Sequence, residues 1–467
     1  MKIRYAFFVI LLFTFIQPLE GKAFKLQDHP EVMTHYMERS MEEYKIPGAS
    51  LAIIQDGEFV YHHQYGEGTN GEAIHAETPF VIGSLSKSLT ALAVMMLVEN
   101  EEIDLDESIN TYIPTFQYET KSGQLIKVKH LLDHTSGISS YDSYTVTDQQ
   151  RSEQGAIREA VVDLSGVTLD QEPGEHYDYH SANYLLLGFI IEEVSGESFS
   201  DFMTQHLFQP LRMENTSAAY ESAVEDGYMP GFQSWGGFPV ASDGFYDHAG
   251  APYGYITSTA EDLASFLYFL LEGGDLLTDE NLQRMITPPE AGKTYHFGWH
   301  FSEQDQVPYH GGAVPDFRSQ MYFVPDKGDA AVLLTNKYHS LEDSQITQFM
   351  DGVSLIMEGN EPGEIVPQGN LLFWSIVGGV LLFAGMSITH FILIKKRFVG
   401  RKTTIIISII CLLVSITSIP VIIQFVGLPW RTFALFAPDV AVFVYVLITI
   451  FVLHAFKSLV YLRKHIC

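Results

Sequence analysis

Cysteine is nearly absent from this chain of 467 residues. The two cysteines present, Cys411 and Cys467, stand close to the C-terminus, so no disulfide can form in the long region before them. A domain in that region has to be held by its hydrophobic core alone, and about 300 residues are enough to bury one.

Basic side chains are also scarce, with 27 Lys and Arg against 57 Asp and Glu and a formal net charge of −30. Residues 24–360 are more acidic still, with 15 Lys and Arg against 53 Asp and Glu, a formal net charge of −38. Such a region repels phosphate backbones and anionic lipid, which excludes nucleic acid as a partner. We interpret the acidic excess as a solvating surface rather than a binding site.

The motifs of several cofactor classes are missing as well. The sequence has no phosphate-binding glycine loop, no dinucleotide fingerprint and no H-E-x-x-H, so we expect no cofactor and no metal. His248, beside Asp247, could reach a site from a loop, although a surface position is the simpler interpretation. Four other histidines without an evident third ligand are interpreted as ordinary sheet residues: His62, His63, His296 and His300.

The longest apolar runs occur at the two ends of the chain. Near the N-terminus, Lys2 and Arg4 precede the run YAFFVILLFTFI, and small residues follow at Gly21 and Ala23. This is the layout of a secretory signal, so we expect residues 1–23 to be a signal peptide or a signal anchor. At the other end, three apolar segments can each cross about 30 Å of hydrocarbon as a helix. They lie at roughly 371–394, 403–426 and 440–461.

Charge in the connections between these segments predicts an orientation. The first connection and the C-terminal tail are rich in Lys and Arg, whereas the second connection holds only Arg431. Positively charged connections stay in the cytoplasm, so we expect the C-terminus inside and the domain at 24–360 outside. The sequence thus predicts a multi-pass membrane protein, with a linker at 361–370 and a three-helix transmembrane region at 371–467.

The domain at 24–360 begins and ends with strand patterns. The stretch GASLAIIQDGEFVYHHQYG predicts a hairpin that turns at Asp56-Gly57, and short strand patterns recur from YHFGWHFSE to AAVLLTN. Helices are predicted from Ser84 and over STAEDLASFLYFLLEGG, with a further amphipathic helix before the linker. Because residues 102–250 between the strands are irregular and helical, we expect an α+β fold with one sheet and a helical insertion.

A hydroxyl and a lysine crowd the start of the apolar helix in PFVIGSLSKSLTALAVMMLVEN. Lys87 lies one turn inside the positive end of the helix dipole. A positive charge at this position destabilises the helix by roughly 0.3–1 kcal/mol. Ser84 lies three residues earlier on the same face. Burial there favours the neutral amine, which can accept a proton. A lone S-x-x-K is expected about once by chance in such a chain, so the pair alone does not establish catalysis.

Three more stretches change this interpretation: HLLDHTSG at 130–137, EPGEHYDYHSANYLLLG at 172–188 and YHGGAVPDFRSQMYFVP at 309–325. With S-x-x-K, in this order, they resemble the serine β-lactamase and penicillin-binding-protein superfamily, in its class C-like branch. The resemblance covers nearly all of residues 30–357. It implies a β-lactamase-like antiparallel sheet flanked by helices, with an all-helical insertion. We interpret the HTSG stretch as a structural turn.

The resemblance also implies roles for individual residues. Ser84 would be the nucleophile, with Lys87 and Tyr179 as partners, and either the neutral lysine or a tyrosinate could take its proton. The backbone N–H groups of Ser84 and Ala313 would form the oxyanion hole. The substrate-binding positions implied in the same way are Ser181, His310, Gly311 and Gly312.

Two departures from the family pattern bear on the substrate. The second motif usually reads Tyr-x-Asn, but this chain has Tyr179-His180-Ser181, so a short hydroxyl replaces an amide that binds the acyl part of the substrate. His310 stands in place of a lysine and weakens the fixed positive charge that would hold a β-lactam carboxylate. Both departures argue against a dedicated β-lactamase.

The domain order resembles that of membrane-anchored prodrug-activating D-amino-acid peptidases of the colibactin-maturing type. We therefore expect a serine peptidase that removes an N-acyl-D-amino-acid cap from a small peptide through an acyl-enzyme. A D-alanyl-D-alanine carboxypeptidase or an esterase of the cell envelope is the alternative within the enzyme class. A sensor that a β-lactam or an envelope ligand acylates once is the alternative of another class. The oligomeric state stays open.

Overall fold

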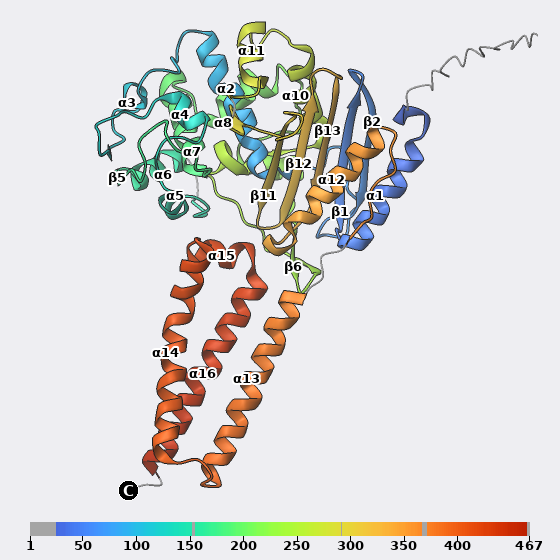
Figure 1. Ribbon diagram of the computed structural model, residues 1–467. Helices are drawn as coiled ribbons and strands as arrows, with labels where there is room; N and C mark the ends of the chain where they lie inside the picture. Colours follow the sequence, from blue (N-terminus) through green and yellow to red (C-terminus); the bar gives the residue numbers. More distant parts are fainter. Residues whose placement is uncertain (1–24, 152–154, 291, 367–370, 465–467) are drawn as a thin grey trace, which may run out of the picture.

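A computed structural model describes residues 25–151, 155–290, 292–366 and 371–464. The predicted signal at 1–23 and residues 367–370 of the predicted linker lie outside the described residues. Within those ranges an α+β domain stands at one end of a bundle of long helices (Figure 1).

A seven-stranded antiparallel sheet forms the centre of the domain, in the order β2-β1-β13-β12-β11-β10-β9. β1 and β2 form the predicted hairpin, and Asp56 and Gly57 both take a positive φ at its turn. β1 also pairs with β13, which joins distant parts of the chain as predicted. The strands are β1 (Gly48–Gln55), β2 (Glu58–Gly66), β9 (Tyr295–His296), β10 (Trp299–Phe301), β11 (Pro308–Val314), β12 (Phe317–Val324) and β13 (Asp329–Thr335).

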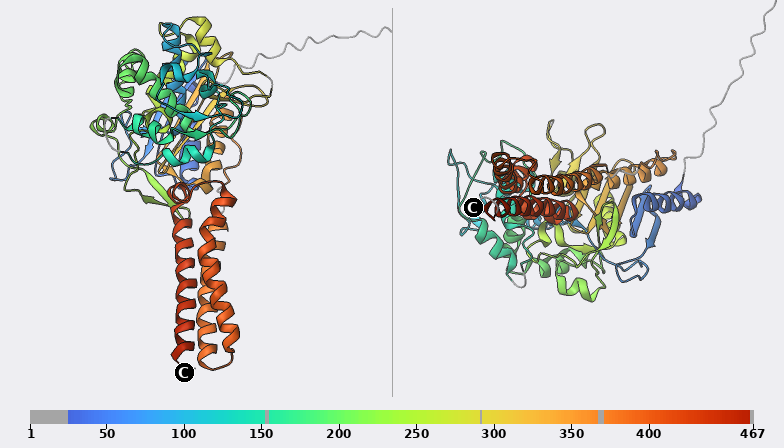
Figure 2. Two further views of the ribbon diagram at one scale, coloured as in Figure 1. Left: turned by 90° about the vertical axis from the view of Figure 1, so that its left-hand side faces the viewer. Right: turned by 90° about the horizontal axis from the view of Figure 1, so that it is seen from below.

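Helices cover both faces of this sheet, so its central strands are buried on both sides (Figures 1 and 2). On one face, α1 (Pro30–Tyr44) and α12 (Asp343–Met357) enclose a core of their own with β1 and β13. On the other face, α2 (Ser86–Glu99) and α10 (Ala260–Glu272) belong to a larger core that continues into the helical region. The site lies at the start of α2.

The helix predictions hold with one change at a boundary. α10 begins after Thr259, whose side chain accepts a hydrogen bond from the Asp262 N–H, and it ends at Glu272 with Gly273 as its C-cap, inside the predicted stretch. The long apolar helix begins at Ser86 rather than at Ser84, because a 3₁₀ turn, η2 (Gly83–Leu85), precedes it. Ser84 is thus held in a turn that the helical pattern did not indicate.

The helical insertion is confirmed in outline, although it is not wholly helical. A short parallel ribbon, β4 (Tyr118–Glu119) with β5 (Val167–Thr168), crosses it. Its longest helix, α7 (Ser181–Ser195), is apolar on almost every side and buried through most of its length. The other helices are α3 (Ile109–Tyr112), α4 (Val128–Leu132), α5 (Ser140–Val146), α6 (Ala156–Leu164), α8 (Phe199–Phe202), η3 (Met203–Phe208) and α9 (Tyr220–Glu225).

Smaller elements complete the domain. A hairpin of β6 (Phe232–Trp235) and β7 (Phe238–Ala241) pairs with β14 (Lys337–Tyr338) near the long helices, as Figure 1 shows for β6. The remaining elements are β3 (Phe80–Val81), β8 (Thr257–Ser258), η1 (Leu26–Asp28), η4 (Ala251–Tyr255), α11 (Asp279–Ile286) and η5 (Ser340–Glu342).

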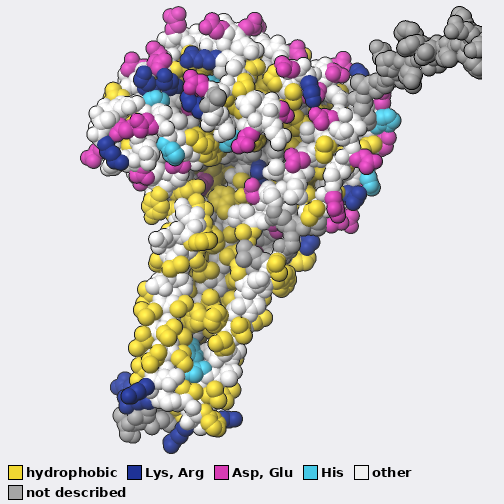
Figure 3. Space-filling model, viewed as in Figure 1, with side chains coloured by type: hydrophobic (Ala, Val, Ile, Leu, Met, Phe, Trp, Pro, Cys, Tyr) yellow, Lys and Arg dark blue, Asp and Glu magenta, His cyan; other side chains and the backbone are white. Residues whose placement is uncertain are grey.

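Three C-terminal helices are long and apolar enough to cross a membrane: α13 (Leu371–Lys395), α14 (Arg401–Val426) and α16 (Pro438–Lys464). They correspond to the three predicted apolar segments. Figure 3 shows hydrophobic side chains along the bundle and basic side chains at the end far from the domain. The connection between α14 and α16 contains a short helix, α15 (Trp430–Phe436), which the sequence did not predict.

Candidate active site

The turn before α2 is fixed by its close approach to β11. Gly83 has a φ of 55°, and a Cβ there would lie 2.3 Å from the backbone nitrogen of Ala313. The Ser86 hydroxyl donates to the Gly83 carbonyl at 2.8 Å and closes the turn. Only glycine fits at position 83, and the turn therefore sets Ser84 beside the strand that carries Ala313.

Lys87 is completely buried in the first turn of α2. Its Nζ lies 2.9 Å from the Ser84 Oγ and donates to the Tyr253 carbonyl at 2.7 Å. Burial lowers the pKa of Lys87 to about 7, while the charge of Asp148 opposes the change. A large fraction of this amine is therefore neutral near neutral pH.

Tyr179 stands on the other side of the same pair, just before α7. Its ring centroid lies 5.1 Å from the Lys87 Nζ. The Ser84 side chain acts on its hydroxyl and lowers its pKa, against the larger effect of burial. Burial raises the pKa of Tyr179 well above its ordinary value, so the phenol keeps its proton at neutral pH. The structure thus brings together the three side chains that the motifs singled out.

Histidines surround Tyr179, and because they are neutral they add no positive charge to the site. His134 is the nearest, with its ring centroid 4.4 Å from that of Tyr179, followed by His300 at 5.5 Å and His310 at 6.1 Å. Burial lowers the pKa of His300 to about 4 and that of His134 and His310 well below the usual range. These rings add hydrogen-bonding surface but no fixed positive charge.

Two of these histidines differ from their sequence-based interpretation. His300 was expected to be an ordinary sheet residue, but β10 presents it to the site, where its ring centroid is 5.0 Å from that of His310. His134 belongs to the HTSG stretch, which was interpreted as a turn only. Tyr295 also packs against Tyr179, at 5.6 Å, and its hydroxyl lies 3.3 Å from the His310 Nε2. Nothing local in the sequence indicated these positions.

The other predicted histidines lie away from Ser84. His296 pairs with Asp133 at 2.8 Å, and His62 lies near Glu261 at 3.5 Å. His248 packs its ring on Tyr220 and Tyr246. In the described ranges no three His, Cys, Asp or Glu side chains gather as a metal site.

The glycines of β11 allow neighbouring parts of the chain to pack closely against this strand. A Cβ on Gly312 would lie 2.1 Å from the Ile82 carbonyl oxygen, and a Cβ on Gly311 would lie 2.9 Å from the Arg318 guanidinium. Gly311 and Gly312 were expected to bind substrate, and the structure gives them a packing role as well. Gly312 allows β11 to close on the turn before Ser84.

Ser181 is the first residue of α7 and is partly exposed. Asn183, two residues further, is buried, and its amide contacts His134 at 3.0 Å and His180 at 3.3 Å. The nitrogen of that amide is committed to the two histidines, so it does not replace the amide that Tyr-x-Asn places two residues earlier.

Comparison with known proteins decides the family. The Beta-lactamase family model matches residues 33–349, which is more than half of the chain and contains every residue of the cluster. The chain belongs to the beta-lactamase family. The enzyme class expected from the sequence, a serine hydrolase of this family, is thereby confirmed.

Individual relatives of this beta-lactamase family member are distant. Protein flp of Staphylococcus aureus strain MW2 is 26% identical over 318 residues, 66% of this chain and 63% of that protein. Penicillin-binding protein 4* of Bacillus subtilis is 26% identical over 333 residues, 65% of this chain and 71% of that protein. The aligned part therefore spans less than two thirds of the length of protein flp.

Solved structures agree on the fold. The octameric penicillin-binding protein homologue from Pyrococcus abyssi superposes with a TM-score of 0.62 and 24% identity, over 73% of this chain and 80% of that chain. This likeness confirms the expected α+β, β-lactamase-like architecture for the family member described here.

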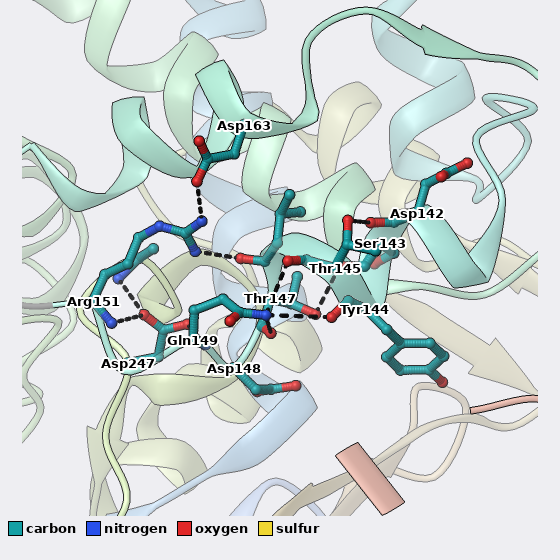
Figure 4. A network of polar contacts seen from close by, with 12 residues as sticks. Asp142, Ser143, Tyr144, Thr145, Thr147, Asp148, Gln149, Arg151, Asp163 and Asp247 are labelled. Atoms are coloured by element: carbon teal, nitrogen blue, oxygen red, sulfur yellow. Dashed lines mark hydrogen bonds and ion pairs between the residues drawn. The ribbon is translucent and has the colours of Figure 1, made fainter. Parts of the chain in front are cut away.

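A polar network that the motifs did not indicate surrounds Asp247 (Figure 4). Asp247 accepts hydrogen bonds from the backbone N–H groups of Gln149, at 2.8 Å, and Arg151, at 3.1 Å. The Tyr253 hydroxyl also donates to Asp247, at 3.1 Å. This network fixes η4, whose Tyr253 carbonyl accepts from the catalytic candidate Lys87.

A cavity of about 1000 Å³ adjoins the site without containing Ser84. Tyr177 and Tyr295 line it, and the ring centroid of Tyr295 is 5.6 Å from that of Tyr179.

Proposed function

We propose that this chain hydrolyses an acyl bond through an acyl-enzyme on Ser84. The observation that carries the proposal is the buried Lys87 amine 2.9 Å from the Ser84 Oγ, with its pKa lowered to about 7. In its neutral form the amine keeps its hydrogen bond to the Tyr253 carbonyl and turns its lone pair to the serine hydroxyl. It can then take the proton as Ser84 attacks the substrate carbonyl carbon.

The high pKa of Tyr179 favours Lys87 over tyrosinate as the base. A protonated phenol beside Ser84 is instead placed to donate a hydrogen bond and to pass a proton to the leaving group. The backbone N–H groups of Ser84 and Ala313 are proposed to stabilise the tetrahedral oxyanion, a role that the close packing of Gly83 on β11 supports. Water then releases the acyl group from Ser84.

We propose an N-acyl-D-amino-acid cap on a peptide prodrug as the substrate. Uncharged His310 supports a substrate without a free carboxylate at the scissile end, which counts against a D-alanyl-D-alanine carboxypeptidase. The three apolar helices beside the domain suit an amphiphilic precursor, and Figure 3 shows a recess lined by hydrophobic side chains above them. An uncharged ester fits the same site, so an esterase is the second candidate.

The orientation in the membrane is part of the proposal. Basic residues gather in the connection after α13 and at the end of α16, which supports a cytoplasmic position for both. The domain at 24–360 is then outside the cytoplasm, the linker at 361–370 joins it to the helices, and residues 1–23 direct export.

The test uses purified full-length protein and mass spectrometry. Wild type is incubated with N-acyl-D-asparaginyl amides, with D-alanyl-D-alanine peptides and with p-nitrophenyl acetate, beside Ser84→Ala and the control Ser265→Ala, a partly exposed serine of α10. We expect repeated turnover of the D-asparaginyl amides and an acyl adduct in wild type and Ser265→Ala but not in Ser84→Ala. Cleavage of D-alanyl-D-alanine peptides alone would overturn the prodrug assignment. A single stable adduct without turnover would identify a sensor.

A further inference from the structure

The connection between the second and third membrane-span candidates packs on the hydrolase domain. α15 lies against that domain in Figure 1, and Leu435 packs on its large core. The ring of Phe436 meets that of Tyr338 edge-on, with 5.9 Å between centroids. Arg431 donates from its Nη2 to the Thr147 carbonyl at 3.3 Å. The membrane region is therefore docked on the domain as well as joined to it by the linker.

The turn that Arg431 contacts has an unusual backbone. Asp148 and Gln150 both take left-handed conformations, with φ values of 56° and 53°, although neither is glycine. Such conformations persist where the surroundings hold them, and they gather at functional sites. Asp247 holds the turn from inside through two backbone N–H groups, as Figure 4 shows. Arg431 holds it from the membrane side.

Asp148 links this turn to the catalytic amine. Its backbone N–H donates to the Tyr253 hydroxyl at 3.1 Å, and its carboxylate accepts from the Tyr255 hydroxyl at 2.7 Å. The carbonyl of the same Tyr253 accepts from Lys87 at 2.7 Å. One tyrosine therefore joins the turn to the lysine by two hydrogen bonds.

The charges around Asp148 act on Lys87 in a definite direction. Burial raises the pKa of Asp148 to about 6, Asp247 adds to the rise, and the charges of Arg431 and Lys87 oppose it. Tyr144 and Tyr255 also face this carboxylate. An ionised Asp148 in turn raises the pKa of Lys87. Anything that moves or neutralises Asp148 therefore leaves Lys87 neutral at lower pH.

We propose that Arg431 is a positioning residue of the hydrolase: from the membrane region, it holds the 147–151 turn so that Asp148 faces Lys87. This inference rests on the proposed function, in which Lys87 serves Ser84. Because the arginine comes from the connection between the two apolar helices, the membrane region forms part of the catalytic unit.

The test compares pH profiles of kcat/KM for p-nitrophenyl acetate in full-length protein held in detergent micelles. Arg431→Gln should lower kcat/KM about threefold to tenfold at the plateau, because the turn no longer holds Tyr253 and Lys87 in place. It should also move the acid limb to lower pH, because Asp148 acts less on Lys87. Arg431→Lys should leave the acid limb at the same pH as in wild type, since it keeps the positive charge. Arg401→Gln, at the far end of the bundle, is the matched control and should resemble wild type.

Two further measurements separate positioning from loss of folded protein. Counting acylated Ser84 by mass spectrometry normalises every rate to competent enzyme. In a double-mutant cycle, Asp148→Asn should move the limb in the same direction, and Arg431→Gln should add little to it. A profile of Arg431→Gln that superimposes on wild type overturns the inference alone. A wild-type enzyme that never acylates Ser84 overturns the proposed function first.

Discussion

At the scale of single residues, the proposed chemistry depends on the protonation of one amine. Burial lowers the pKa of Lys87 to about 7, whereas His134 and His310 stay neutral far below that pH and Tyr179 stays protonated far above it. In the described site, Lys87 is thus the group whose titration falls nearest neutral pH, with Asp148 somewhat lower, at about 6.

This assignment predicts the pH dependence of turnover. As pH falls through the pKa of Lys87 the amine becomes an ammonium and can no longer accept the serine proton. We expect kcat/KM to fall by about tenfold or more between about pH 7.5 and about pH 5.5. The measurement is the rate of p-nitrophenyl ester hydrolysis across that range. A flat profile would contradict Lys87 as the base, and Lys87→Met, which removes the amine, should be inactive at every pH.

The residues found from sequence and those missed differ in how they reach the site. Ser84 and Lys87 are three residues apart, so a local pattern reveals them, and Tyr179 stands in a motif of its own. His300 and Tyr295 reach the ring of Tyr179 only because β9 and β10 extend the sheet edge past it. No spacing in the chain encodes such a long-range contact. For the same reason a sheet histidine and a site histidine look alike in sequence.

At the scale of elements, the predictions succeeded where a segment carries its own signal. The Asp56-Gly57 hairpin and the capped helix α10 follow from turn and cap residues within them. The start of α2 was placed two residues early, because its 3₁₀ turn depends on contact with β11 rather than on helical pattern. The short helices of the insertion, such as α3 and α4, depend on packing and were predicted only as a helical region.

The tight contact between η2 and β11 gives a prediction at this scale. Gly83→Ala places a methyl group against the Ala313 nitrogen and at a positive φ, so we expect a loss of roughly 3 kcal/mol or more in the free energy of unfolding. Gly71→Ala is the matched control, because its φ is also positive but nothing lies within 4 Å of the new Cβ. It should cost about 1 kcal/mol.

Denaturant unfolding of both variants checks this prediction, and acylation of Ser84 reports the site. We expect the acylation rate of Gly83→Ala to fall, because the turn and the Ala313 N–H move apart. Equal losses of stability in the two variants would mean that backbone conformation alone, rather than contact with β11, sets the requirement for glycine at position 83.

At the scale of the whole molecule, hydropathy predicted the three long helices but not how they meet the domain. The second connection was noted only for its single arginine, whereas it forms α15 and packs on the domain. The junction also contains a buried polar pair: Asp439, at the start of α16, lies 2.8 Å from the His339 Nε2, and both side chains are 4% exposed. Asp439 also accepts from the Gly236 N–H at 2.9 Å. These contacts join residues about 100 and 200 positions apart, which sequence patterns do not encode.

The buried pair predicts how firmly the two regions are joined. Asp439→Ala leaves the Nε2–H of the buried His339 imidazole and the Gly236 N–H without their acceptor, which costs about 3 kcal/mol at the junction. We expect faster amide hydrogen exchange in β6, β7 and α15 of the full-length protein, with α10 unchanged. Asp439→Asn should show a smaller effect, since its amide oxygen can still accept from Gly236. Asp326→Asn, in the exposed turn after β12, is the control and should leave exchange at the junction as in wild type.

The same variant connects the junction to catalysis. If α15 is held in place partly through the start of α16, Asp439→Ala should also move the acid limb of kcat/KM to lower pH, as Arg431→Gln does. Exchange that rises at the junction without any change in the pH profile would show that α15 keeps its place by its own contacts. Unchanged exchange in Asp439→Ala would mean that the buried pair does not hold the domain on the helices, and that the packing of Leu435 and Phe436 is sufficient for docking.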